Sequence, residues 1–241
     1  PTLDPSYAGK TLTEDQTKAS ASLRAAVATR AYGTTLLKGV TGSGKTEVYL
    51  EAVAECLAQG RQALVLLPEI ALTAEFLTRV DARFGAKPAE WHSGVTITER
   101  RRVWKMVAQG GAQLVVGARS SLFLPFRDLG LIVVDEEHDT SYKQEDGVLY
   151  NARDMAVLRA SICGAQVILA SATPSLESWA NADAGKYTKL ELTSRFGAAV
   201  MPDMHAIDMR NEQLPSSSWI SPTLQRAVQQ RLDNKEQALL F

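Results

Sequence analysis

The sequence predicts an α/β fold with a mainly parallel sheet and helices on both faces. Between residues 34 and 173, short apolar runs alternate with longer segments of helical pattern. The runs are almost continuously apolar, which is typical of strands buried on both faces. Strands that alternate with helices imply crossover connections and therefore parallel pairing.

The predicted elements follow in chain order. The apolar runs predict strands at 34–39, 62–68, 112–118, 129–135 and 166–172, with a weaker strand at 88–92. The segments between them predict helices at 45–59, 73–84, 98–109 and 152–163. Thr98 is the expected N-cap of the third helix, because it precedes ERRRVWKMV.

We expect three regions along the chain. Residues 1–33 form a lead-in with a helix, 34–193 form the α/β lobe, and 194–241 form a linker and the start of a second lobe. In the last region, Ser221 and Pro222 are the expected cap and first residue of an amphipathic helix.

Both ends of the chain suggest a piece of a longer protein. The first residue is Pro1 instead of Met. The stretch YTKLELT (187–193) predicts one more strand, and ALLF (238–241) begins a new apolar run at the last residues. We therefore expect a truncated second domain.

Composition limits the class of protein. A net charge of −1 and a pI near 6.4 argue against a uniformly basic DNA-binding domain, although local basic patches stay possible. No apolar run reaches the roughly 18 residues needed to span a bilayer, and no signal peptide opens the chain. Cys56 and Cys163 are too few for a disulfide framework or a zinc site, and we expect both in the core. A cytoplasmic protein without a membrane partner is expected.

A glycine-rich phosphate loop lies between the first predicted strand and its helix. Residues 39–46 read GVTGSGKT, which fits the pattern G-x-x-x-x-G-K-[ST]. Glycines allow successive backbone N–H groups to turn toward phosphate oxygens, and the following helix directs its positive end at the same anion. The expected nucleotide contacts come from Gly39, Thr41, Gly42, Ser43, Gly44, Lys45 and Thr46. Lys45 would reach the β and γ phosphates, and Thr46 would bind Mg²⁺. The alternative is a chance glycine-rich turn.

An acidic cluster around one histidine ends the 129–135 strand, in LIVVDEEHD. Asp135 is the expected Mg²⁺ residue, and Glu136 would orient and deprotonate the attacking water. His138 suits a sensor of the γ phosphate, because imidazole both donates and accepts hydrogen bonds. We expect Glu137 and Asp139 to face solvent. The alternative is a solvated turn.

The stretch SATP (171–174) follows the 166–172 strand. Hydroxyl groups of Ser171 and Thr173 would bond the side chain of His138 or Asp135 and report the nucleotide state. The alternative is that they are local caps at the strand end.

In this order the phosphate loop, D-E-x-H and S-A-T resemble the first motor lobe of a superfamily 2 helicase, a RecA-like lobe. Six stretches together resemble the PriA family of bacterial primosomal helicases: GVTGSGKTEVY, LPEIALT, HSG, GARSSLFLPF, DEEHDTSYKQ and SATPSLES. The stretch LTEDQ (12–16) is similar to the family's adenine-recognition stretch, which implies that Gln16 contacts the base.

The resemblance also implies DNA-contacting and coupling residues. They lie in PEIALT, in GARSS, in the aromatic-rich loop 139–154 and in SATP, and comprise Pro68, Glu69, Thr73, Arg119, Tyr142, Lys143, Tyr150, Arg153, Ser171 and Thr173. From the residues alone, the alternative for Arg119 is an ion pair with a carboxylate, and Tyr142 and Tyr150 fit partly buried packing roles equally well.

The resemblance implies a lobe of an ATP-dependent 3′–5′ DNA helicase of replication restart and primosome assembly. ATP and Mg²⁺ are the implied cofactors, and zinc belongs to the second lobe beyond residue 241. The implied partners of the intact protein are single-stranded and forked DNA, primosome proteins and single-strand-binding protein. We expect the lone lobe to hydrolyse ATP weakly or not at all. The alternatives are another superfamily 2 translocase, similar to RecG, and a nucleotide-controlled interaction module.

Overall fold

The computed structural model describes residues 2–193, 203–212, 214 and 219–240. The chain divides into two compact units, Pro1–Ala198 and Ala199–Phe241. The first unit contains the sheet and the candidate site.

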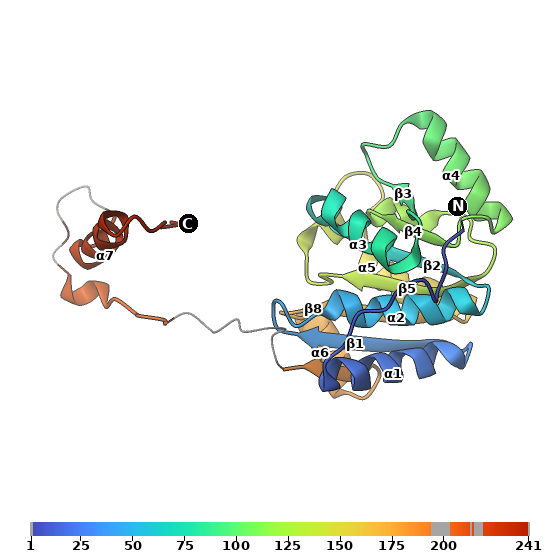
Figure 1. The fold of residues 1–241 in the computed structure, drawn as a ribbon, viewed down its shortest axis with the longest axis horizontal. Helices are drawn as coiled ribbons and strands as arrows, with labels where there is room; N and C mark the ends of the chain where they lie inside the picture. Colours follow the sequence, from blue (N-terminus) through green and yellow to red (C-terminus); the bar gives the residue numbers. More distant parts are fainter. Residues whose placement is uncertain (1, 194–202, 213, 215–218, 241) are drawn as a thin grey trace. The chain divides into compact units, whose positions relative to one another are not determined.

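A seven-stranded sheet forms the centre of the first unit, in the order β3-β4-β2-β5-β8-β1-β9 (Figure 1). The strands are β1 (Gly33–Gly39), β2 (Gln62–Leu66), β3 (Ala89–Trp91), β4 (Leu114–Gly117), β5 (Leu129–Asp135), β8 (Gln166–Ser171) and β9 (Thr188–Leu192). Every neighbouring pair is parallel. The predicted α/β class, the seven predicted strands and their parallel pairing are therefore confirmed.

Successive residues of the inner strands are buried on opposite faces. Val65 and Val133 belong to one core cluster, whereas their neighbours Leu64 and Ile132 belong to the other. Side chains alternate across a strand, so a sheet covered on both sides needs apolar residues at every position. This explains the continuous apolar runs of the sequence.

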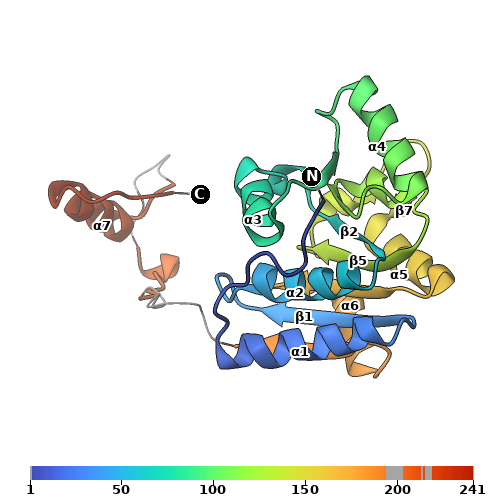
Figure 2. The ribbon, with the colours of Figure 1, turned by 45° about the vertical axis from the view of Figure 1, so that its right-hand side comes forward.

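Three helices cover each face (Figure 2). One face carries α1 (Glu14–Ala28), α2 (Lys45–Ala58) and α3 (Ala74–Phe84), and α1 lies beside α2. The opposite face carries α4 (Ile97–Gln109), α5 (Ala152–Cys163) and α6 (Leu176–Asp183). Parallel strands need such crossover helices, because the chain must return to the same edge before each new strand.

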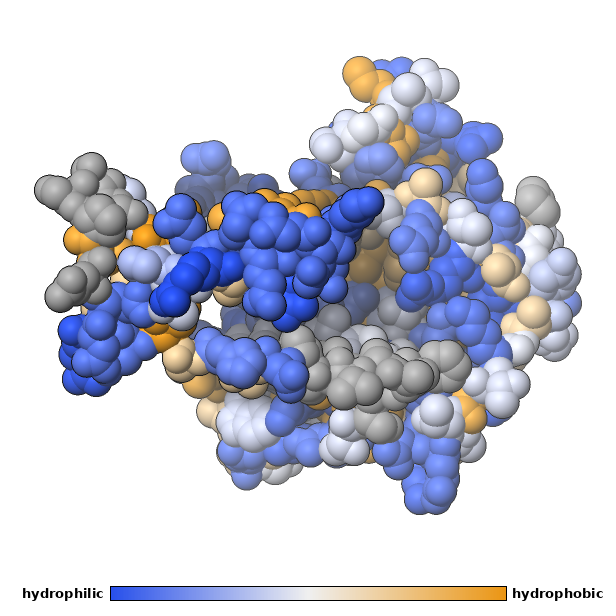
Figure 3. Space-filling view, turned by 60° about the vertical axis from the view of Figure 1, so that its left-hand side comes forward, coloured by the Kyte–Doolittle hydropathy of each residue, from blue (hydrophilic) through white to orange (hydrophobic). Residues whose placement is uncertain are grey.

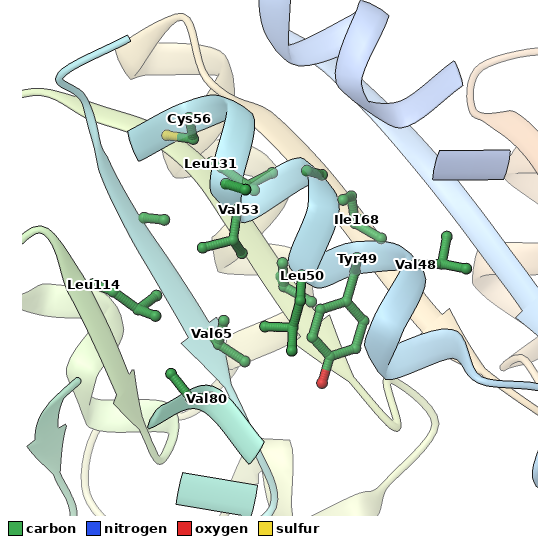
Figure 4. Close-up of a cluster of buried hydrophobic side chains, with 14 of the residues drawn as sticks. Val48, Tyr49, Leu50, Val53, Cys56, Val65, Val80, Leu114, Leu131 and Ile168 are labelled. Atoms are coloured by element: carbon green, nitrogen blue, oxygen red, sulfur yellow. The ribbon is translucent and has the colours of Figure 1, made fainter. Parts of the chain in front are cut away.

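Helix α2 packs over the middle of the sheet and links the core to the candidate site. In Figure 4, Leu50 and Val53 of this helix lie over Val65 and Leu131 of the strands.

The face of the molecule in Figure 3 is mostly hydrophilic, with small separate hydrophobic areas. No helix of the described residues is long and apolar enough to cross a membrane.

Two local predictions were wrong. Thr96, not Thr98, caps α4, because the Thr96 side chain accepts a hydrogen bond from the Glu99 backbone N–H. Cys163 is exposed at the end of α5, whereas Cys56 is buried as expected. Burial raises the pKa of the Cys56 thiol to about 12.

The sequence reading missed two elements. Helix α6 follows the SATP stretch, and its N-cap is Ser175. A short antiparallel pair, β6 (Lys143–Gln144) and β7 (Tyr150–Asn151), lies within the predicted loop 139–154. Both are shorter than the runs from which periodicity can be read.

The second unit contains α7 (Pro222–Asp233), with Ser221 as its N-cap and Pro222 in its first turn, as predicted. Residues 238–240 have no regular structure. Within the region 194–241, predicted as a linker and the start of a second lobe, residues 194–202, 213, 215–218 and 241 lie outside the described residues.

Candidate active site

The three predicted motifs meet at one edge of the sheet. Gly39 ends β1, Asp135 ends β5 and Ser171 ends β8, and these strands are neighbours in the order β5-β8-β1. Parallel strands bring their carboxyl ends to the same edge, which is where α/β proteins bind ligands. The site is therefore a direct consequence of the strand order.

At two positions of the loop, Gly39 and Gly44, the structure leaves no room for a Cβ atom. Gly44 has a φ of 80°, and a Cβ atom there would lie 2.4 Å from Gln16 Nε2. A Cβ atom at Gly39 would lie 2.4 Å from Ser43 Oγ. The loop is thus a tight cradle that side chains would fill.

The cradle is lined by polar groups that can donate hydrogen bonds. Ser43 Oγ is buried without a hydrogen-bond partner among the described residues. Helix α2 begins after the cradle without a side-chain cap, so its first N–H groups point at the same space. Lys45 is 9% exposed, and its Nζ donates to the Gly39 carbonyl at 2.9 Å. Together these donors suit an anion.

A cleft of about 580 Å³ opens above the cradle. Its lining comes from the lead-in, the phosphate loop, α3 and the ends of β5 and β8, and comprises Lys10, Thr11, Leu12, Gln16, Thr41, Gly42, Gly44, Lys45, Thr46, Glu47, Arg79, Asp135, Glu136, His138, Ala172 and Thr173. The size suits a drug-sized ligand such as a nucleotide.

Gln16 lies at the wall of this cleft but is 3% exposed. Its Oε1 accepts from the Thr13 backbone N–H at 2.9 Å, and its Nε2 donates to the Ser43 carbonyl at 2.8 Å. An amide keeps one acceptor lone pair and one N–H beyond these bonds. The residue therefore supports the phosphate loop, and its contact with a base stays a prediction.

Asp135 is a buried carboxylate at the end of β5. Burial raises its pKa above the ordinary value, and the hydrogen bond from Tyr49 opposes the rise. The Tyr49 hydroxyl donates to Asp135 Oδ2 at 2.9 Å, and the Glu136 backbone N–H donates to Oδ1 at 3.0 Å. A cation beside this carboxylate would offset its desolvation.

The next residues form a strained turn. Glu136 has a φ of 47°, which is rare for a residue with a side chain. Its side chain reaches the cleft, and its Oε2 lies 3.5 Å from His138 Nδ1. His138 Nδ1 lies 2.7 Å from Ser171 Oγ, which also accepts from the Thr173 backbone N–H. The predicted contact between SATP and the histidine is thus present, and strain of this kind clusters at functional sites.

The donor set fits a Mg²⁺–nucleotide complex. Among the described residues, no group of three or more His, Cys, Asp or Glu side chains is arranged to hold a metal ion. Mg²⁺ is commonly held by one or two protein ligands together with substrate phosphates. Thr46 and Asp135 line the cleft together and would supply those ligands.

Glu137 is not solvent-facing, contrary to the prediction. It is 2% exposed and bonds to Ser175 and Ser178, which lie 38 and 41 residues further along the chain. Asp139 is partly buried, and its side chain accepts from the Ser141 N–H. The prediction failed because no local pattern shows which distant hydroxyls reach a carboxylate.

Two of the predicted DNA-contacting side chains, those of Tyr142 and Arg153, make their polar contacts inside the protein. Tyr142 is 1% exposed, and its hydroxyl donates to the carbonyls of Asp135 at 2.6 Å and Leu66 at 3.0 Å. Arg153 is 7% exposed and bonds to Ser175 Oγ at 2.7 Å. The predictions that a base stacks on Tyr142 and that Arg153 contacts DNA directly were therefore wrong, because protein encloses both side chains in this structure.

The predicted DNA residues of PEIALT, GARSS and the rest of the loop lie close together beside the site, and several of them are exposed. Arg119 donates to the carbonyls of Ser141 at 2.9 Å and Lys143 at 3.0 Å. Lys143, Glu69 and Thr73 are exposed, whereas Pro68 is buried and Tyr150 partly buried against Phe123. A cavity of about 100 Å³ is lined by residues of PEIALT, GARSS and the loop. The structure thus brings the three stretches together, and their binding of DNA stays a prediction.

Sequence reasoning missed several residues of this site. Lys10, Glu47 and Arg79 line the cleft, and Lys10 Nζ lies 2.7 Å from Glu47 Oε1. Tyr49, on α2, donates a hydrogen bond to Asp135 Oδ2. For Tyr49 a signal existed, since an aromatic residue one helical turn after a phosphate loop faces the sheet. For the others only the tertiary structure shows proximity.

The fold and the site together define the class: an α/β lobe with a phosphate loop on β1, a D-E-x-H turn on the second strand from it and the SATP stretch at the end of β8 between them. Residues 13–182 match the DEAD/DEAH box helicase family, and the chain belongs to that family.

Particular relatives are the replication restart proteins named PriA. The chain is 48% identical over 207 residues to the one from Rickettsia felis, covering 86% of this chain and 32% of that protein. It is 42% identical over 231 residues to the one from Bacillus subtilis, covering 95% and 29%. The predicted resemblance is confirmed, and the chain spans about a third of the length of these relatives.

Solved structures show the same fold. RecG bound to a three-way DNA junction matches with a TM-score of 0.59 at 22% identity, over 79% of this chain and 25% of that one. The Hef helicase domain of Pyrococcus furiosus matches with a TM-score of 0.51 at 18% identity, over 76% of this chain and 40% of that one. At these identities the likeness concerns the fold alone.

Proposed function

We propose that the chain is the ATP-binding lobe of an ATP-dependent 3′–5′ DNA helicase that acts in replication restart. The observation that carries this proposal is the convergence of Lys45, Asp135 and His138 on one cleft, above a cradle in which the buried Ser43 Oγ has no hydrogen-bond partner among the described residues. The sequence similarity to replication restart proteins supports the proposed role in replication restart.

Five residues of the cleft, together with Ser171, have a task in this proposal. Lys45 and the backbone of the phosphate loop bind the β and γ phosphates, and Thr46 and Asp135 hold Mg²⁺. Bound Mg²⁺ neutralises charge on the phosphate oxygens. Glu136 orients the attacking water and accepts its proton. His138 and Ser171 pass the state of the γ phosphate to the segment after β8.

The surface formed by PEIALT, GARSS and the loop 139–154 is the proposed track for single-stranded DNA. Arg119 and Lys143 supply positive charge there, and Tyr150 an aromatic face at the base of the loop. In the intact protein the partners are forked DNA, primosome proteins and single-strand-binding protein. Zinc and the arginine that stabilises phosphoryl transfer belong to the second lobe.

The test compares ATP hydrolysis by this chain and by a longer protein that includes the second lobe, each with and without single-stranded DNA. An arginine supplied to the phosphoryl group is worth ~10³–10⁵ in rate. We therefore expect slow, DNA-independent hydrolysis by the chain and fast, DNA-stimulated hydrolysis by the longer protein.

Glu136→Gln sharpens this test. The variant should abolish turnover by the longer protein and leave ATP binding intact, whereas Glu14→Gln, an exposed change on α1, should alter neither. Rapid hydrolysis or strand separation by the lone chain would contradict the assignment of roles. ATP binding without any turnover by the longer protein would favour the interaction module instead.

A further inference from the structure

Glu137 is a buried carboxylate inside the D-E-x-H turn, and it does not line the nucleotide cleft. Its Oε1 accepts from the Ser175 backbone N–H at 2.7 Å. Its Oε2 accepts from the hydroxyls of Ser175 at 3.0 Å and Ser178 at 2.9 Å. The carboxylate thus holds the first turn of α6, the helix that follows the SATP stretch (171–174).

Arg153 completes the cluster from a third element. Its Nη1 lies 3.4 Å from Glu137 Oε2 and donates to Ser175 Oγ at 2.7 Å. The guanidinium also donates from Nε to Asp154 at 2.8 Å. Because Arg153 is in the first turn of α5, directly after β7, it fixes the end of the loop that begins at Asp139.

The start of the same loop is fixed at a different point of the site. The Tyr142 hydroxyl donates to the carbonyl of Asp135, and the backbone N–H of Glu137 donates to the carbonyl of Ala170, the residue before Ser171. The exposed residues 145–149 therefore lie between two buried attachments. Both attachments lead to the turn that carries Glu136 and His138.

A buried ion pair is costly to form, because both charges lose their hydration. Here the pair contributes nothing to the lining of the cleft, and apolar residues of similar volume would fill the same space without that cost. The charged groups add a defined geometry. Three hydrogen bonds and one ion pair hold the D-E-x-H turn, α5 and α6 in one arrangement.

We propose that Glu137 is a positioning residue which, through Arg153, Ser175 and Ser178, couples the nucleotide-dependent D-E-x-H turn to α6 and to the base of the loop 139–154. This inference rests on the proposed function. A movement of the turn on nucleotide binding then reaches both the segment after β8 and the loop proposed to contact DNA.

The experiment is hydrogen–deuterium exchange on this chain, with and without Mg²⁺ and a non-hydrolysable ATP analogue. The variant is Glu137→Gln, which keeps a side chain of the same shape and the capacity to bond Ser175 and Ser178 but removes the charge facing Arg153. The matched control is Glu177→Gln, since Glu177 Oε2 also lies near Arg153, at 3.8 Å, but its side chain is 70% exposed. Affinity for the analogue is measured on the same samples.

We expect the wild-type chain and Glu177→Gln to gain protection at residues 150–156 and 171–183 when the analogue binds. Glu137→Gln should bind the analogue with unchanged affinity and lose that gain. A purely structural role would change the protection of the free protein but not the difference that the analogue makes.

Three results would overturn the inference. One is an equal gain of protection in Glu137→Gln and wild type, and another is no gain in wild type despite binding. The third is a failure of the wild-type chain to bind the analogue, which refutes the proposed function as well. If Glu137→Gln does not fold, Ser178→Ala removes one hydrogen bond of the cluster and is judged by the same criteria.

Discussion

At the scale of single residues, the glycines of the phosphate loop are required for different physical reasons. Gly42 and Gly44 both have positive φ values, 78° and 80°, which residues with a Cβ atom adopt only at a cost in conformational energy. A Cβ atom at Gly42 would meet open space, whereas one at Gly44 would meet the Gln16 amide. The two positions therefore separate backbone strain from steric conflict.

Gly44→Ala should destabilise the first unit more than Gly42→Ala. The αL conformation costs about 1–2 kcal/mol in both variants. Gly44→Ala also displaces Gln16 and leaves its buried partners unsatisfied, which adds roughly 1–3 kcal/mol. Urea unfolding, followed by circular dichroism, measures the difference. Equal losses of stability would mean that Gln16 moves aside freely.

At the scale of elements, helix ends show how closely local chemistry controls the structure. Thr96 and Thr98 both precede an apolar helical pattern, and both are exposed. Only Thr96 has extended backbone dihedrals and a side chain that accepts from the N–H three residues later. A helix begins where an acceptor reaches an unpaired N–H group, and a threonine two residues inside offers none of this.

Thr96→Ala should therefore reduce the free energy of unfolding by about 1 kcal/mol, since it removes the cap of α4. Thr98→Ala is the control and should leave stability nearly unchanged, because its hydroxyl caps nothing. Thermal unfolding of both variants decides the matter. A larger loss in Thr98→Ala than in Thr96→Ala would assign the cap to the wrong threonine.

At the scale of the whole molecule, the hydrophobic clusters found among the described residues both lie in the first unit. Both buried clusters draw their residues from between Leu3 and Leu192. All the residues that line the nucleotide cleft also fall in this range. A domain that contains its own core can fold alone.

A chain that ends at Ala198 should fold cooperatively and bind ATP as the chain of 241 residues does. Its thermal midpoint and its affinity for the nucleotide, measured by calorimetry, are the two readouts. Lys45→Ala in the shortened chain is the control that should abolish binding. A shortened chain that folds but no longer binds ATP would show that residues after 198 take part in the site.

Much of the fold and the phosphate site follows from local pattern. The strand that ends at Asp135 is recognisable because both faces of a parallel sheet require apolar residues, and GVTGSGKT is recognisable because a phosphate cradle needs glycines before a helix. These signals lie within a few neighbouring residues. Of the two partners predicted for the SATP hydroxyls, His138 and Asp135, the structure places His138 beside Ser171, since parallel strands bring their carboxyl ends together.

The order of residues by itself thus determined the α/β class, the strands, the phosphate loop and the acidic turn. The tertiary structure decided which polar groups of those segments are buried and what they contact. Glu137 is identical in chemistry to Glu136, yet it is enclosed because Arg153 and α6 pack against it. Tyr142 is enclosed because its hydroxyl bridges two strands. Burial depends on segments that are distant along the chain, and no local pattern records them.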